Sequence, residues 1–213
     1  MIKKGSLVLF QGDSITDTER GRDAAGPNDR VGLGRGYVFL IASRLRAERA
    51  GDDLRFLNRG ISGNRIVDLY ARWKEDGLNL KPDLISILVG VNDTWHEFMR
   101  QAGVTVPKFE RIYRQLLTET REALPGTKLV LCEPFTLPCG VVTPAWTQDM
   151  ALRRAVVRRL AQEFAAPFVP FQATFDEALK EAPPEYWAQD GVHPTAAGHY
   201  RMACAWLKVV EGD

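Results

Sequence analysis

The residues Leu84-Ile-Ser-Ile-Leu-Val-Gly-Val-Asn-Asp93 form an almost continuous apolar run that ends in a polar turn. A strand with one exposed face alternates apolar and polar residues, whereas an unbroken run is typical of a parallel strand buried on both faces. Similar runs occur before and after it, separated by longer stretches of helical periodicity. The predicted strands are Leu7–Phe10, Leu54–Leu57, Leu84–Val89, Lys128–Leu131 and Pro167–Phe171. The predicted helices are Tyr37–Arg49, Ile66–Glu75, Phe109–Leu124, Met150–Phe164 and a last helix that begins after Pro194.

This alternation predicts an α/β fold in which helices cover both faces of a five-stranded parallel sheet. The chain has 213 residues and no internal repeat or linker, so we expect a single domain over residues 1–213. Ligands of such sheets bind at the carboxyl ends of the strands, and the loops there should hold the functional residues. The glycine-rich stretch Thr18–Arg35 follows the first strand and is expected to form part of the rim of the site. It lacks the spacing of a dinucleotide-binding fingerprint.

Composition excludes several classes of protein. Lys and Arg number 28 against 27 Asp and Glu, a net charge of +1, so no field of one sign would attract nucleic acid. No apolar run approaches the roughly 18 residues that cross a bilayer, and the amino-terminal run is too short for a secretory leader. The three cysteines, Cys132, Cys139 and Cys204, form no CxxC pair. They predict reduced thiols in a cytoplasmic protein. From the net charge and the short apolar runs we expect neither a nucleic-acid nor a membrane partner.

The helix predicted over Met150–Phe164 carries a cluster of arginines. Its periodicity places Leu152, Val156 and Leu160 toward the core and leaves Arg153, Arg154, Arg158 and Arg159 on the outer face. We interpret the arginines as a solvated helix face.

Ser14 follows the first predicted strand and is the candidate nucleophile. A serine hydroxyl needs a base within hydrogen-bond reach, and the chain offers only His96, His193 and His199. We expect His96 in a loop near the rim and His199 inside the last helix as a surface or packing residue. Asp190 stands three residues before His193 across a glycine, so its carboxylate can accept from one ring nitrogen and leave the other aimed outward. A simple capping turn is the alternative interpretation of Asp190 and His193.

Acyl transfer also needs hydrogen-bond donors where the carbonyl oxygen becomes negative. The backbone N–H of Ser14 is one candidate, provided that this residue begins a helix. Gly63 can present a second N–H because glycine permits close backbone approach, and the side-chain amide of Asn92 can supply a third. Taken singly, Gly63 and Asn92 could equally be turn residues.

The remaining aromatic, acidic and thiol groups have structural interpretations beside functional ones. Trp95 and Trp187 lie three residues from Asn92 and Asp190, where each could stack on a sugar ring or pack in the core. Trp73 and Trp206 are expected in the core. Asp13, Asp17 and Asp93 are interpreted as loop anchors, and Cys132 and Cys139 as packed thiols.

Gly12-Asp13-Ser14, Gly63, Asn92 and Asp190-x-x-His193 together resemble the four sequence blocks of the SGNH hydrolases, also called GDSL esterases and lipases. The resemblance runs from Leu7 to the last helix. It implies a flavodoxin-like, three-layer α/β/α sandwich, with Ser14 as nucleophile, His193 as base and Asp190 as its partner. It also implies an oxyanion hole made by Ser14, Gly63 and Asn92, with no cofactor or metal. The GxSxG elbow of the α/β-hydrolases is absent from the sequence.

Further segments resemble the acetylxylan-esterase branch of this family, which removes acetyl groups from the xylose units of xylan fragments. They are Gly12–Asp17, Gly34–Val38, Asn58–Asn64, Ala71–Trp73, Gly90–Trp95 and His193–His199. The resemblance implies a serine esterase, an acetylated saccharide as substrate and a homo-oligomer. A short-chain lipase, thioesterase or lysophospholipase of the same family remains an alternative. A second alternative is metal-assisted phosphate hydrolysis, with Asp13, Asp93, Asp190 and His193 as metal ligands. A third alternative is a binding module that has lost catalysis.

Overall fold

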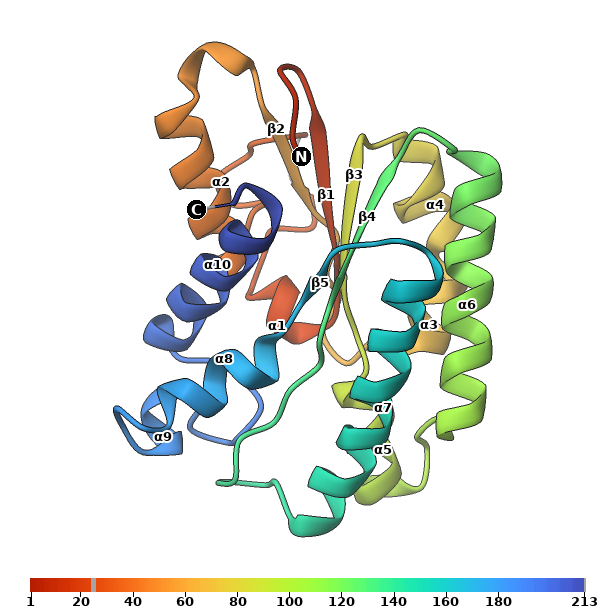
Figure 1. Ribbon diagram of the computed structural model, residues 1–213, viewed down its shortest axis with the longest axis vertical. Helices are drawn as coiled ribbons and strands as arrows, with labels where there is room; N and C mark the ends of the chain where they lie inside the picture. The colour runs from red at the N-terminus through yellow and green to blue at the C-terminus, as the bar shows by residue number, and fades with distance from the viewer. Residues whose placement is uncertain (24–25, 213) are drawn as a thin grey trace.

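The computed structural model describes residues 1–23 and 26–212 and has a central sheet of five parallel strands (Figure 1). The strands are β1 (Leu7–Gly12), β2 (Arg55–Asn58), β3 (Leu84–Leu88), β4 (Lys128–Cys132) and β5 (Phe168–Val169). Their order is β2-β1-β3-β4-β5, and each neighbouring pair is parallel. The direction of chain progression therefore reverses between β1 and β3, which is where open parallel sheets bind ligands.

The helices form a layer on each side of the sheet (Figure 1). They are α1 (Ser14–Asp17), α2 (Tyr37–Glu48), α3 (Ile66–Ala71), α4 (Trp73–Asp76), α5 (Val91–Arg100), α6 (Val106–Ala123), α7 (Pro144–Glu163), α8 (Phe171–Ala178), α9 (Pro184–Trp187) and α10 (Ala196–Val210). Helices α2, α8 and α10 cover one face, and α3, α6 and α7 cover the other. This arrangement confirms the predicted three-layer α/β/α fold.

Strand β1 contributes to two separate hydrophobic cores because its successive side chains point to opposite faces. Val8 and Phe10 pack with α2, α8 and α10, while Leu7 and Leu9 pack with α3, α6 and α7. Trp206 of α10 is fully buried, lies 5.2 Å from the Phe10 ring and donates its indole N–H to Ser86 Oγ at 2.9 Å. The last helix is thus fixed against the centre of the sheet, and the expectation that Trp206 is a core residue is confirmed, as it is for the buried Trp73.

Several predicted boundaries and faces need correction. The helix predicted over Ile66–Glu75 is broken at Arg72 into α3 and α4, and α5 and α8 were not predicted. In α7, Leu152 is 57% exposed and Arg153 is 1% exposed, the reverse of the prediction. Arg153 is tolerated in the core because its guanidinium donates to Thr94 Oγ1, Asp149 Oδ2 and the carbonyl of Val104. No helix in the described ranges is both long and apolar enough to span a bilayer.

Candidate active site

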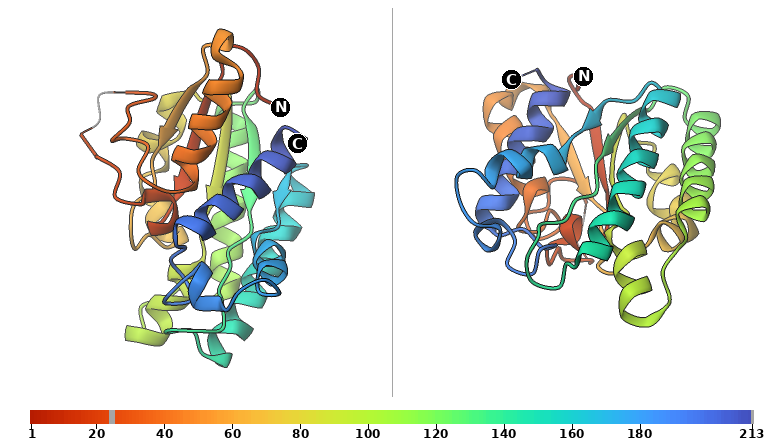
Figure 2. Two further views of the ribbon diagram at one scale, coloured as in Figure 1. Left: turned by 90° about the vertical axis from the view of Figure 1, so that its left-hand side faces the viewer. Right: turned by 60° about the horizontal axis from the view of Figure 1, so that its bottom comes forward.

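Ser14 is the first residue of the one-turn helix α1, two positions after the end of β1. The ribbon of α1 follows directly on that of β1, both in red in Figure 2 (right). Asp13 caps this helix, and its Oδ1 accepts a hydrogen bond from the N–H of Ile15 at 3.0 Å. Gly12 has no room for a side chain, because a Cβ there would lie 2.3 Å from the carbonyl oxygen of Leu88 and 2.5 Å from Thr16 Oγ1. The strand therefore turns directly into α1 and presents Ser14 at the edge of the sheet.

Ser14, His193 and Asp190 form a continuous hydrogen-bonded chain, although 179 positions separate the serine from the histidine. Ser14 Oγ lies 2.8 Å from His193 Nε2, and His193 Nδ1 lies 2.6 Å from Asp190 Oδ2. Asp190 Oδ1 also accepts from the backbone N–H groups of Val192 and His193. With Nδ1–H held by the carboxylate, Nε2 is left as an acceptor that faces the serine hydroxyl.

The charge on Asp190 is stabilised by these bonds. Partial burial would raise the pKa of this carboxyl, but the hydrogen bonds from the His193 ring and from two backbone amides outweigh it and hold the pKa below its usual value. Asp190 therefore remains an anion that can stabilise a protonated His193.

The turn that carries Asp190 is clamped by the segment that follows β4. The N–H of Leu137 donates to the carbonyl of Gly191 at 2.8 Å, and the N–H of Val141 donates to the carbonyl of Asp190 at 3.1 Å. Gly140 has a φ of +58° and no room for a Cβ, which would lie 2.4 Å from Asp190 Cα. This clamp was not predicted, because no single residue in the segment 137–142 suggests a contact with a turn 50 positions downstream.

Two backbone N–H groups, one at Ser14 and one in the loop that follows β2, have no acceptor in the described part of the chain. Within residues 1–23 and 26–212, neither the N–H of Ser14 nor that of Gly63 donates to another protein atom. The first N–H groups of a helix have no partner inside it, which explains the free donor at Ser14. Gly63 has a φ of +83°, a conformation that favours glycine.

Asn92, the third predicted donor, lies in the first turn of α5 next to the Gly63 loop. Its side-chain amide donates to the carbonyl of Asn64 at 3.3 Å, and one of its two N–H bonds is left for another acceptor. Asp93 holds the same two loops together, because its carboxylate accepts from the N–H of Ile66 at 3.1 Å. Burial raises the pKa of Asp93, and that of Asp13, to about 7. The expectation that these two carboxyls anchor loops is confirmed.

Arg72 positions the site, a role that its residue type and its place in the sequence did not predict. Its guanidinium donates to Gln11 Oε1 at 2.9 Å and to the carbonyl of Gly12 at 3.3 Å, and thus supports the end of β1. Its Nε donates to Asn64 Oδ1 at 2.7 Å, which ties the same strand to the Gly63 loop.

The two tryptophans predicted to bind substrate lie in different environments. Trp95 on α5 is partly exposed, and its ring centroid lies 5.6 Å from that of His193. Trp187 is only 4% exposed, and its indole N–H donates to the carbonyl of Ala178. The prediction of sugar contact does not fit Trp187, because Arg201 and Tyr186 pack on its ring and it belongs to the core.

The remaining histidines and Cys132 lie on other parts of the fold. His96 lies on α5 rather than in the predicted loop. His199 is buried on α10, accepts from the N–H of Tyr37, and has a pKa lowered to about 4 by burial. Burial raises the pKa of Cys132 to about 12, as expected for a packed thiol. Among the residues that the structure describes, no group of three or more His, Cys, Asp and Glu side chains is arranged to hold a metal ion.

Comparison with known proteins gives a consistent result. Residues 10–201 match the GDSL-like Lipase/Acylhydrolase family. The chain is 38% identical over 213 residues to an acetylxylan esterase of Geobacillus stearothermophilus, covering 98% of this chain and 95% of the relative. A crystal structure from Parabacteroides merdae, described as a GDSL-like lipase, is 42% identical, with a TM-score of 0.97 over 100% of this chain and 99% of the other.

Catalytic mutants of the Geobacillus enzyme have also been solved, in which a serine, a histidine or an aspartate is replaced by alanine. They align with TM-scores of 0.89 at 36% or 37% identity, and the alignments cover 97% or 98% of this chain and 94% or 95% of theirs.

Proposed function

Because the chain belongs to the GDSL-like lipase/acylhydrolase family, and is a carboxylic ester hydrolase, we propose that it removes O-acetyl groups from xylo-oligosaccharides or related carbohydrate. The observation that carries the proposal is the hydrogen-bonded chain from Ser14 Oγ through His193 to Asp190, with contacts of 2.8 and 2.6 Å. These distances suit a nucleophile, a general base and an orienting carboxylate.

In the first half of the reaction, His193 Nε2 takes the proton of Ser14 as Oγ attacks the acetyl carbonyl. The protonated His193 then donates to the sugar oxygen as the bond between that oxygen and the acetyl carbon breaks. The sugar leaves as an alcohol, and the acetyl group stays on Ser14 Oγ. In the second half, His193 takes a proton from water, the resulting hydroxide attacks the acetyl-enzyme, and acetate leaves as Ser14 regains its proton. Asp190 holds the ring in the required tautomer and stabilises the imidazolium throughout.

The negative oxygen of the tetrahedral intermediate would accept from the N–H groups of Ser14 and Gly63 and from the Asn92 amide. The two backbone donors are without a protein partner in the described part of the chain, which is what an incoming oxyanion requires. Each such donor contributes on the order of 3 kcal/mol to stabilising a transition state.

Trp95 supports a carbohydrate as the leaving group. His193 must protonate the sugar oxygen, so the sugar ring lies next to the imidazole during the reaction. Trp95 lies beside that imidazole and is partly exposed, and we propose that the exposed part of its ring stacks on the sugar. The similarity to an acetylxylan esterase points to the same substrate class.

The test is acetate release from acetylated xylo-oligosaccharides by the wild-type protein and by Ser14→Ala. We expect release by the wild type and a loss of at least about 10⁴-fold in kcat for the variant. Ser6→Ala, at the amino end of β1, is the matched control and should retain activity. Nitrophenyl acetate and nitrophenyl octanoate are compared in parallel. Faster hydrolysis of the octanoyl ester would favour a lipase or thioesterase, and activity in Ser14→Ala would refute the mechanism.

A further inference from the structure

The loop that carries Gly63 is held by hydrogen bonds rather than by packing. Ser62 is exposed, and a Cβ built on Gly63 would have no neighbour within 4 Å. An oxyanion donor stabilises a transition state only if its direction is fixed before the reaction. Some other group must therefore fix the peptide that contains the Gly63 N–H.

Arg72 and Asn92 hold Asn64 on one side of Gly63, and Asp17 holds Ser62 on the other side. Asp17 Oδ2 accepts from the N–H of Ser62 at 2.9 Å and from Ser62 Oγ at 3.1 Å. Asp17 is 4% exposed and ends α1, the same one-turn helix that begins with Ser14. A single buried carboxylate thus joins the helix of the nucleophile to the residue that precedes the predicted donor.

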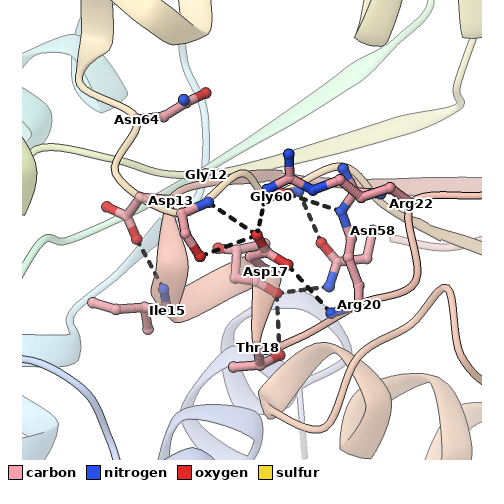
Figure 3. A network of polar contacts seen from close by, with 12 residues as sticks. Gly12, Asp13, Ile15, Asp17, Thr18, Arg20, Arg22, Asn58, Gly60 and Asn64 are labelled. Atoms are coloured by element: carbon pink, nitrogen blue, oxygen red, sulfur yellow. Dashed lines mark hydrogen bonds and ion pairs between the residues drawn. The ribbon is translucent and has the colours of Figure 1, made fainter.

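The carboxylate is also held by the segment that follows α1 (Figure 3). Its Oδ1 accepts from the N–H of Arg20 at 3.2 Å, and Arg22 forms an ion pair with Oδ2 at 3.4 Å. Arg20 in turn donates through Nε to the carbonyl of Gly60 at 2.7 Å, in the loop after β2. Gly60 packs directly on α1, because a Cβ there would lie 2.4 Å from the backbone nitrogen of Asp17.

We propose that Asp17 is a positioning residue for the oxyanion hole, which fixes the Gly63 N–H relative to Ser14 by anchoring both polar groups of Ser62. The proposal rests on the esterase function proposed above. Asp17 takes no part in proton transfer, because its two oxygens are occupied by the Arg20, Ser62 and Arg22 donors. Its loss would disorder one donor and leave the chain from Ser14 to Asp190 intact.

The test compares Asp17→Ala, Asp17→Asn and Ser62→Ala on nitrophenyl acetate. For Asp17→Ala we expect kcat to fall about 10- to 100-fold at nearly constant KM, approaching the 10²–10³ of a lost oxyanion donor. Asp17→Asn keeps one acceptor oxygen and should recover part of the loss. Ser62→Ala keeps the backbone bond and should lose the least.

Two further measurements separate positioning from folding. The pH dependence of kcat should keep its midpoint in Asp17→Ala, and an alkylboronic acid that forms a tetrahedral adduct on Ser14 should bind about tenfold or more weakly. Asp83→Ala is the matched control, because Asp83 accepts a hydrogen bond from the N–H of Leu7 at the amino-terminal end of β1, away from the site. It should lower the melting temperature without changing kcat.

A kcat of Asp17→Ala within twofold of the wild type would overturn the proposal. So would an effect confined to KM, or a loss of kcat that Asp83→Ala reproduces at equal loss of stability. Ser14→Ala distinguishes this failure from failure of the proposed function: an inactive Ser14→Ala beside a fully active Asp17→Ala refutes only the role of Asp17.

Discussion

Replacing Asp190 by Asn tests the hydrogen-bonded chain at its most exacting point. Asp190 accepts three hydrogen bonds, from His193 Nδ1 at 2.6 Å and from the backbone N–H groups of His193 and Val192 at 2.7 and 2.9 Å. An asparagine has one acceptor oxygen and one NH₂ group at the same positions, so it cannot satisfy all three donors.

Both orientations of the amide damage the site. If the oxygen faces the two backbone donors, the NH₂ group faces Nδ1, which must then lose its hydrogen. The imidazole then carries its hydrogen on Nε2, where it points at Ser14 Oγ and cannot accept the serine proton. If the oxygen faces Nδ1 instead, the NH₂ group opposes two backbone N–H groups at less than 3 Å and the turn must shift.

The orientation in which the amide oxygen faces the backbone donors keeps both backbone hydrogen bonds and should therefore predominate. It is also the orientation that gives the wrong tautomer of His193. We therefore expect kcat to fall about 10³- to 10⁴-fold, in line with the effect of removing the orienting carboxylate from a serine triad, while KM changes little. Initial rates on nitrophenyl acetate at pH 7 measure the loss, and Asp83→Asn is the control for an aspartate that accepts a backbone N–H away from the site. A kcat for Asp190→Asn within tenfold of the wild type would refute the role assigned to Asp190.

Two other substitutions probe the clamp and the buried imidazole. Gly140→Ala forces a Cβ against the backbone of Asp190, so kcat should fall at least about tenfold by displacement of the turn. Gly126→Ala has no atom within 4 Å of its Cβ and serves as the control, and equal activities would contradict the clamp. His199→Gln should change the pH dependence of stability, because the pKa of His199 falls from 6.5 to about 4 on folding. The unfolded chain binds the extra proton, so the stability of the wild type relative to His199→Gln should decrease by about 3 kcal/mol from pH 7 to 4. Urea unfolding of both proteins measures the difference in stability at each pH. The opposite contribution of Asp13 and Asp93 is present in both proteins and cancels in this difference. Parallel curves of stability against pH would contradict the prediction.

The fold was predictable where a segment has one strong pattern. The apolar runs at β1, β3 and β4 predicted buried parallel strands, and the structure confirms them. Helix α5 was missed because its first turn, Val91-Asn92-Asp93, contains residues that usually form turns. In the structure, Asp93 in this turn accepts from the N–H of Ile66 at the start of α3, a tertiary contact that the local sequence does not reveal. Arg153 was placed outward because a charged residue is rarely buried, and only its tertiary partners make the inward position favourable.

The candidate site was predictable in its residue types but not in its supports. The spacing of Asp190 and His193 and the position of Ser14 after a strand are visible in the sequence, and the structure brings the three together. The clamp at Gly140 and the link through Arg72 depend on contacts between distant segments, which spacing does not encode. Trp187 was ambiguous for the same reason, since an aromatic residue near a site suits the core as well as a ligand.

The separation of Ser14 from His193 along the chain also bears on biosynthesis. A ribosome synthesises the helix that carries the Ser14 hydroxyl first, and the His193 imidazole follows 179 positions later. The turn that presents it is clamped by the segment that follows β4, which is made earlier. A nascent polypeptide in which His193 has not yet been made therefore holds Ser14 without its imidazole partner, and the hydrogen-bonded chain can form only after the turn of Asp190 has docked on the segment that follows β4.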